Sequence, residues 1–578
     1  MKGRTILAAV LLLAGCAALY VLQRHKVTAE ITPRPILYLV ADTEREAERI
    51  PLALTRVSDK EENDAGVQLV RDYGLLPDRP SGQDAVRISN ELRRVGTRVA
   101  ANVHRKGIYY HFYLRDDPGF VNAFALPGGH IVVGRGLLEL LESEDELAAV
   151  LGHEISHVDN RHAIERLQYE LASRKLGLGE FYSLGSAGVQ IFQAGYNKDQ
   201  ELEADRVGLD FAVAAGYSPA GAVTLMQRFE RLEKESSEKP SSAVEELAQI
   251  PFDSLREYFR SHPPASERAA ALRAEIRARG WNPSRAQQTL PIRTIFLADA
   301  AEGLDRKGDF KGSIQHYQEA LQKDRDYARA WEGLAKVSWR SGDAAATVTA
   351  ATEAVRRAPA PANWGLLGHA LAVVDSHGGA SALRKLAEEV NQTSNPKGLP
   401  WRNLEIAGLE FMGGRGEALD EFRAQLPVGL SGRELVDLQQ EMAWWMYRAG
   451  KLDTAEKELE SARQSFPQIT DTYLELAWVL TDLGRQADAE TMLNKIQPFP
   501  VSISRQAAEA VIEWRTGRRD EAKNSFRLAA ENDPAWMVPR WVENNYSPSV
   551  AGVVGQLQAI EIARRQKELQ EKQRHAGD

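Results

Sequence analysis

The chain has 578 residues, which is too long for a single hydrophobic core and predicts two or three domains. Its composition, 43% hydrophobic and 26% charged, is that of an ordinary globular protein. The formal net charge of -9 argues against the global basic field that attracts nucleic acid, so we expect no nucleic-acid partner. Because Cys16 is the only cysteine, a disulfide within the chain and a cysteine-based metal site are excluded. Any metal must be held by His, Asp or Glu.

The strongly apolar segment at the N-terminus predicts export from the cytoplasm. Lys2 and Arg4 precede an apolar run over residues 6–22, which is the pattern of an export signal. Within it, Leu13-Ala-Gly-Cys16 resembles a bacterial lipobox, so Cys16 is a candidate for lipidation. An uncleaved membrane anchor and a simple cleaved signal are the alternatives for residues 1–26. We therefore expect the protein in the periplasm or cell envelope, tethered to a membrane by lipidated Cys16 or by an N-terminal anchor.

The next part of the chain predicts a mixed domain over residues 81–280. Residues 27–80 are polar and are interpreted as a lead-in segment with one or two helices. Ser143, with Glu146 three residues later, has the spacing of a capping box, so a buried helix should begin there. The apolar periodicity predicts the other elements, in chain order, as a helix over 83–105, a strand over 108–114, a turn at 116–119, a short strand over 130–133 and a helix over 200–214.

A linker at 281–295 is predicted to separate this domain from a helical one. Glycines then recur at intervals of 34 or 33 residues, in two runs: Gly308 and Gly342, then Gly450, Gly484 and Gly517. This is the tetratricopeptide period, in which stacked helix pairs bury apolar faces that one pair cannot bury alone. We expect a tetratricopeptide-like domain over 296–550, with two irregular repeats between Gly342 and Gly450. A polar helix or tail should follow over 551–578.

The segment Leu151-Gly-His153-Glu154-Ile-Ser-His157 contains an HExxH pattern on the helix predicted after Ser143. Residues four apart lie on one face, so His153 and His157 can reach a single ion. Glu154 projects beside them, where its carboxylate can take a proton from a metal-activated water. A catalytic zinc needs a third protein ligand. On the helix over 200–214, Glu201 and Asp205 share a face and are both candidates, whereas Glu203 should point elsewhere.

The sequence resembles metallopeptidase family forty-eight, the group that contains HtpX, the CaaX-prenyl proteases and BepA. The resemblance covers roughly residues 80–275 and rests on motifs in the same order, namely Asn122-Ala-Phe-Ala-Leu-Pro-Gly-Gly129 with Gly136-Leu-Leu138, His153-Glu-Ile-Ser-His157, Glu201-Leu-Glu-Ala-Asp205, and Ser261-His-Pro-Pro264 with Glu267-Arg268. With the export signal and the repeats, the chain is most similar to the BepA-type periplasmic protease-chaperones of outer-membrane assembly. The resemblance implies a mainly α chain, with a gluzincin-like α+β zinc metallopeptidase domain that has a small sheet, followed by an α-helical tetratricopeptide-type solenoid.

Position by position, the resemblance implies one zinc ion held by His153, His157 and Glu201, with Glu154 as the general base. Asp205 would orient a ligand imidazole by accepting its other N–H. The alternative for Asp205 is an ordinary helix salt bridge with Arg206 or Lys198.

Three further residues are candidates for the site by the same resemblance or by position. His262 is a candidate fourth ligand that latches the site, or an oxyanion stabiliser. The alternative is that His262-Pro-Pro264 simply starts the next helix. Asn122 and His130 are candidates for an edge strand that pairs an extended substrate. His162, five residues beyond His157, is expected on the surface.

The expected function is that of a zinc metalloendopeptidase in envelope protein quality control. It would hydrolyse misfolded or stalled envelope and outer-membrane proteins, with the repeat domain binding clients or the outer-membrane assembly machinery. A latent or non-proteolytic periplasmic chaperone or scaffold is the alternative. A CaaX-type membrane protease is disfavoured because the sequence has no further apolar spans.

Overall fold

The computed structural model describes residues 57–75, 79–165, 196–236, 263–391, 399–427, 429–496 and 503–576. Two residues singled out above, Cys16 and His262, lie outside these ranges. The described residues divide into two compact units. The first ends at Gln288 and omits residues 82–91, which belong to the second unit together with the chain from Thr289 onward. Among the described helices, none is long and apolar enough to cross a membrane.

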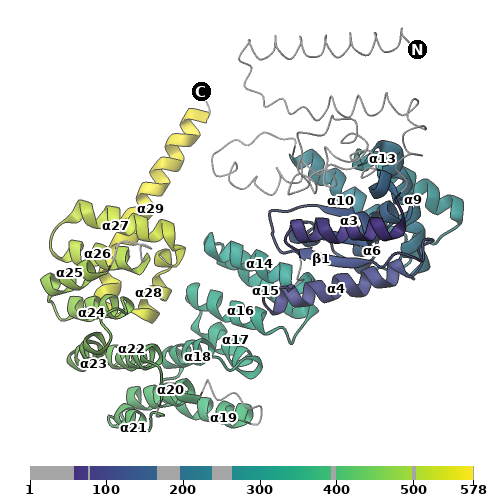
Figure 1. Ribbon diagram of the computed structural model, residues 1–578. Helices are drawn as coiled ribbons and strands as arrows, with labels where there is room; N and C mark the ends of the chain where they lie inside the picture. Colours follow the sequence, from purple (N-terminus) through teal and green to yellow (C-terminus); the bar gives the residue numbers. More distant parts are fainter. Residues whose placement is uncertain are drawn as a thin grey trace, which may run out of the picture. The chain divides into compact units, whose positions relative to one another are not determined.

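The first unit surrounds a small sheet with helices (Figure 1). The three strands lie in the order β1-β3-β2, with β1 parallel and β2 antiparallel to β3. The first residues of α4, up to residue 91, belong to the second unit, and the rest of this helix belongs to the first. The described elements are α3 (Asp59–Asp72), α4 (Gln83–Ala100), β1 (His111–Arg115), β2 (Ala123–Leu126), η2 (Pro127–Gly129), β3 (His130–Gly134), α5 (Arg135–Glu139), α6 (Glu144–Asp159), α9 (Lys198–Ala214), α10 (Ala220–Ser236) and α13 (Ala265–Arg279).

Asn122 and His130, the two candidates for one substrate-pairing edge strand, lie on either side of a reversal between two paired strands. Gly128 and Gly129 have φ angles of 75° and 84°, which let the chain turn back between β2 and β3. His130 consequently lies on the central strand, opposite residues of both β1 and β2. The prediction that His130 belongs to an edge strand is wrong because a glycine turn interrupts the strand pattern.

Helix α6 begins where its cap signal predicts. The Ser143 hydroxyl accepts a hydrogen bond from the backbone N–H of Glu146 at 3.1 Å. The Glu146 carboxylate does not complete a capping box on Ser143. It accepts from the N–H of Glu142 at 2.8 Å and pairs with Arg228 of α10 at 2.6 Å. The same carboxylate thereby ties the start of α6 to α10.

Two glycines allow α6 and α9 to approach closely. A Cβ added to Gly152 of α6 would lie 2.5 Å from the carbonyl oxygen of Gly208 in α9, and one added to Gly208 would lie 2.5 Å from the carbonyl carbon of Gly152. No side chain fits between the helices at this crossing. The close approach brings the HExxH face of α6 against the acidic face of α9.

The second unit is a succession of antiparallel helix pairs (Figure 1). Its described helices are α14 (Arg293–Arg306), α15 (Phe310–Lys323), α16 (Ala328–Arg340), α17 (Ala344–Arg357), α18 (Pro361–Val374), α19 (Gly379–Asn391), α20 (Leu399–Met412), α21 (Ala418–Ala424), α22 (Gly432–Arg448), α23 (Leu452–Ser465), α24 (Asp471–Asp482), α25 (Gln486–Lys495), α26 (Ile503–Arg515), α27 (Arg519–Asn532), η4 (Pro534–Met537), α28 (Pro539–Asn545) and α29 (Pro548–Ala576).

The glycine period has a local conformational cause. Each of the five glycines that define it lies just after the first helix of a pair and has a φ between 71° and 85°. This left-handed conformation ends the helix and turns the chain into the second helix at little cost for glycine. Between Gly342 and Gly450, the described residues form two pairs, α18 with α19 and α20 with α21. Helix α18 ends at Val374 and is capped by Asp375, without a period glycine.

Helix α29 starts before the predicted tail and is partly buried. Val550, Val554 and Leu557 are each at most 1% exposed. They lie one or two turns apart on a helix that packs on α26, α27 and α28. The first turns of α29 therefore cover the apolar end of the repeat unit, and the rest of the helix is polar and exposed.

Candidate metal centre

Two histidines of α6 and one glutamate of α9 converge in the first unit. The Nε2 atoms of His153 and His157 lie 3.2 Å apart. The Glu201 carboxylate lies 3.3 Å from Nε2 of His153 and 3.8 Å from Nε2 of His157. All three residues are buried, and their ligand atoms lie within 4.8 Å of one another. This group could hold a metal ion, and two imidazole nitrogens with one carboxylate form a donor set that suits zinc.

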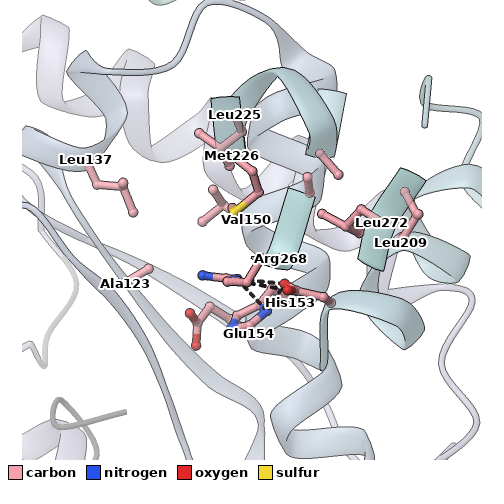
Figure 2. Close-up of a pocket in the computed structure, with 13 residues that line it drawn as sticks. Ala123, Leu137, Val150, His153, Glu154, Leu209, Leu225, Met226, Arg268 and Leu272 are labelled. Carbon is pink, nitrogen blue, oxygen red and sulfur yellow. Dashed lines mark hydrogen bonds and ion pairs between the residues drawn. The ribbon is translucent and has the colours of Figure 1, made fainter. Parts of the chain in front are cut away.

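Behind the cluster, Asp205 of α9 and Arg268 of α13 form a buried ion pair that contacts His153. One Asp205 oxygen lies 2.9 Å from Nδ1 of His153. Arg268 donates to both Asp205 oxygens, from Nε at 2.8 Å and from Nη2 at 2.6 Å. Figure 2 shows the Arg268 guanidinium beside the His153 ring. Burial opposes ionisation of Asp205, but the Arg268 charge holds the pKa of Asp205 well below its usual range.

The alternative of a local salt bridge for Asp205 is not what the structure shows. Lys198 pairs with Glu267 at 2.6 Å, and Arg206 lies 3.9 Å from Glu203 on the same helix. Asp205 faces inward to His153 and Arg268 instead.

Arg268 is the main residue of this site to which sequence reasoning gave no role. In the sequence, Arg268 stands out only as part of the Glu267-Arg268 motif. On α13 the buried side chains are Ala265, Arg268, Ala269, Leu272 and Ile276. Arg268 thus occupies the apolar face of its helix, three residues after one buried position and four before another. A lone arginine in an apolar helical row is a signal that could have identified it, because a buried guanidinium requires an acidic partner.

Glu154 lies beside the cluster and lines a pocket that is partly open to solvent (Figure 2). Burial and the negative charge of Glu201 raise the pKa of Glu154 to about 7, against the opposing charges of His153 and Arg268. Away from these polar groups, most of the pocket lining is aliphatic and includes Leu137, Val150, Leu225 and Met226. The pocket therefore combines a group of charged and polar side chains, namely Glu154, Asp205, His153 and Arg268, with an apolar wall.

His162 is buried, and the prediction that it lies on the surface is wrong. It is 4% exposed, and its Nδ1 lies 3.0 Å from Nδ1 of His157. The reason is the backbone just after α6, where Arg161 has a φ of 65° and turns the chain back toward the helix. The ring of Tyr196 stacks on His157 with centroids 3.9 Å apart, and its backbone N–H donates to Glu201 at 3.0 Å. His162 and Tyr196 thus hold the ligand-bearing side chains, and sequence reasoning gave them no such role.

The remaining candidates lie around the sheet. Asn122 immediately precedes β2, and its carbonyl accepts from the N–H of Gly134 at 2.9 Å. Nδ1 of His130 lies 3.0 Å from the hydroxyl of Tyr113, and its ring stacks on His111. Burial and the charge of His111 lower the pKa of His130 to about 4. The side chain of Glu203 is 46% exposed, consistent with the expectation that it points away from the ligand face.

Comparison with known proteins bears on two of these inferences, the peptidase family and the helical repeat. Residues 87–276 match the family model described as Peptidase family M48, and residues 306–342 match one described as TPR repeat. These matches confirm the resemblance to family forty-eight and the tetratricopeptide period.

Similar proteins include three proteases. Mitochondrial metalloendopeptidase OMA1 of Arabidopsis thaliana is 32% identical over 178 residues, which cover 30% of this chain and 33% of that protein. Beta-barrel assembly-enhancing protease of Yersinia pestis is 29% identical over 24% of this chain and 32% of that protein. Metalloprotease LoiP of Escherichia coli (strain K12) is 28% identical over 33% of this chain and 72% of that protein. The matched region spans about a third of the length of the first two.

Proposed function

We propose that this chain, which carries a peptidase family forty-eight domain followed by a TPR repeat, is a zinc-dependent endopeptidase of the bacterial cell envelope. The observation that carries the proposal is the convergence of His153, His157 and Glu201 with Glu154 beside them. Three protein ligands leave one coordination position for the reaction, whereas structural zinc sites are closed by four. A structural site also has no use for a carboxylate base next to its ligands.

The proposed reaction is hydrolysis of an internal peptide bond. Zinc, when bound, supplies a Lewis acid that polarises the scissile carbonyl and acidifies water. Glu154 takes the proton of the attacking water and passes it to the leaving amine. Asp205 accepts the Nδ1 proton of His153, which directs Nε2 of that ring to the ligand cluster. Arg268 holds Asp205 ionised and in place.

Substrate binding is proposed along β2 and the adjoining pocket. Within the described sheet, β2 is an outer strand paired only with β3, and its first residue, Ala123, lines the pocket. An extended peptide could add to this edge by backbone hydrogen bonds, a mode that tolerates many sequences. The aliphatic lining favours a large apolar side chain next to the scissile bond. Such a site suits unfolded segments, which expose apolar residues.

The cellular location of the protein and its substrates are part of the same proposal. The names of the relatives include a beta-barrel assembly-enhancing protease, and the N-terminal segment has the pattern of a lipoprotein signal or anchor. We place the protein in the envelope, tethered through Cys16 or an anchor. Its substrates would be misfolded or stalled envelope proteins, and the repeat unit would bind them or the outer-membrane assembly machinery. Binding of a client to the repeat unit would raise the local concentration of that client, so weak binding in the pocket would suffice for cleavage.

The test is cleavage of unfolded casein by the purified chain with and without a zinc chelator. Glu154→Gln should lower the rate by about 10²–10⁴-fold while the bound metal is retained. Glu230→Gln, at a helix position where the carboxylate pairs with Lys234, is the matched control and should keep the wild-type rate. A folded, zinc-loaded chain that leaves casein intact would contradict the proposal and favour the latent chaperone or scaffold.

A further inference from the structure

A second group of metal-binding side chains lies in the repeat unit. His369 of α18, Glu405 of α20 and Glu441 of α22 place one ligand atom each within 4.8 Å of one another. Nε2 of His369 lies 2.5 Å from a carboxylate oxygen of Glu441. Each of the three helices is the first of a pair, and the three residues are spaced 36 apart. The repeat architecture therefore aligns them in one row.

Glu405 is the unusual member of this group. Its side chain is fully buried, and among the described residues neither carboxylate oxygen has a hydrogen-bond partner of normal geometry. Gly368 of α18 makes the space that the carboxylate occupies, because a Cβ at that position would lie 2.0 Å from Glu405 Oε2. A carboxylate buried in such surroundings is unstable in its charged form unless a proton or a cation neutralises it.

The surroundings add negative charge to the group. Burial and the negative charge of Glu441 raise the pKa of Glu405 well above its usual value, while the indole N–H of Trp445 opposes the shift. Glu475 of α24 continues the row, and burial with the charge of Glu441 raises its pKa to about 8. His369 pairs with Glu441 of this row, and the charge of Arg433 acts on Glu475. Two acidic side chains, Glu405 and Glu441, thus lie close to one imidazole, and Glu475 lies next in the row.

The imidazole is held in a fixed orientation. Its ring stacks on Trp444 with centroids 3.5 Å apart and meets Trp445 edge-on. The side chains of His369 and Glu441 are 19% and 13% exposed, so solvent reaches the group from their side while Glu405 closes it from within. A site with a rigid nitrogen donor, two carboxylates and an entry path meets the requirements for binding an ion.

We infer that His369, Glu405 and Glu441 form a second metal site, for a divalent transition ion of the zinc class, which links α18, α20 and α22. A mixed set of one imidazole and two carboxylates suits such an ion, whereas magnesium and calcium favour all-oxygen sets. The ion would neutralise the buried carboxylates and contribute its binding energy to folding. It would lie in the irregular stretch of the repeat unit, where α18 lacks the period glycine.

Metal counting on the purified full chain tests this inference independently of peptidase activity. After saturation with Zn²⁺ and dialysis, the wild type should retain two ions per chain by mass spectrometry. Glu405→Gln and His157→Ala should each retain one, and the double variant should retain none. Glu458→Gln removes another buried carboxylate of the repeat unit, which pairs with Arg423, and should leave two. One ion in the wild type with none in His157→Ala would overturn the second site and leave the first intact.

A fluorescence measurement covers the case in which Glu405→Gln does not fold. Cobalt added to the His157→Ala chain should quench the part of the tryptophan emission that comes from Trp444, because that ring stacks on His369. Replacing the partly exposed His369 by Ala should abolish this saturable quenching. Equal quenching with and without His369 would refute the site.

Discussion

The buried pair of Asp205 and Arg268 should contribute strongly to the stability of the first unit. The two residues are 7% and 2% exposed, and two charged hydrogen bonds of 2.8 and 2.6 Å join them. Removing one partner of a buried pair costs about 3–5 kcal/mol, because the remaining charge stays uncompensated in a medium of low dielectric constant. Asp205→Asn should therefore lower the free energy of unfolding of the metal-free unit by about that amount.

The same two helices offer a matched control. Asp210 and Arg279 also join α9 to α13, at 2.9 Å, but their side chains are 27% and 44% exposed. An exposed pair of this kind contributes about 0–1 kcal/mol, since solvent screens it. Asp210→Asn should therefore have little effect, although it removes the same chemical group from the same helix.

Calorimetry of the metal-free full chain measures both variants, and Arg268→Met and Arg279→Met complete two double-mutant cycles. Because the chain has two units, the transition of the first unit must be analysed by itself. Asp205→Asn should also weaken zinc binding by about 10–100-fold through the lost hydrogen bond to His153, whereas Asp210→Asn should not. A coupling energy for Asp205 with Arg268 no larger than that for Asp210 with Arg279 would refute the reasoning.

Three further changes test the packing, the pocket and the repeats. Gly208→Ala should destabilise the first unit by about 1–3 kcal/mol by forcing α6 from α9, and an unchanged melting temperature would contradict the close crossing. Met226→Trp should fill the pocket. It should slow the cleavage of peptides that carry a large apolar residue beside the scissile bond more than the cleavage of peptides that carry alanine there. Equal slowing of both kinds of peptide in a library would show that the pocket does not select for apolar side chains. Gly450→Ala should cost about 1–2 kcal/mol by chemical denaturation because its φ is 71°, while Gly303→Ala, inside α14 with open space around it, should be neutral or stabilising; the reverse order would refute the conformational argument.

The features that the sequence alone determined are those with local causes. His153 and His157 share a face because any α-helix places residues four apart on one side. Ser143 starts α6 because a hydroxyl caps the first free N–H groups. The glycine period marks helix ends because glycine adopts positive φ at little cost. Each follows from a few consecutive residues, so a pattern in the sequence is enough to predict it.

Where a local signal was present but misjudged, the backbone decided the outcome. His162 was placed on the surface from its spacing to His157, but the positive φ of Arg161 reverses the chain at that point. The edge strand expected to include both Asn122 and His130 is interrupted by a turn at Gly128 and Gly129. In both cases the helical or strand period was extended across a residue with left-handed backbone geometry, and beyond such a residue the period no longer holds.

The remaining features depend on residues that only the fold brings together. Arg268 meets Asp205 from 63 positions away in the chain, and its burial follows from the packing of α13 on α9. The row of His369, Glu405 and Glu441 exists because successive helix pairs stack in register, and nothing in any one helix indicates it. Local propensity fixes where helices begin, end and present their faces. Which faces meet, and which charges lose their water, is decided by the tertiary packing that the chain adopts as a whole.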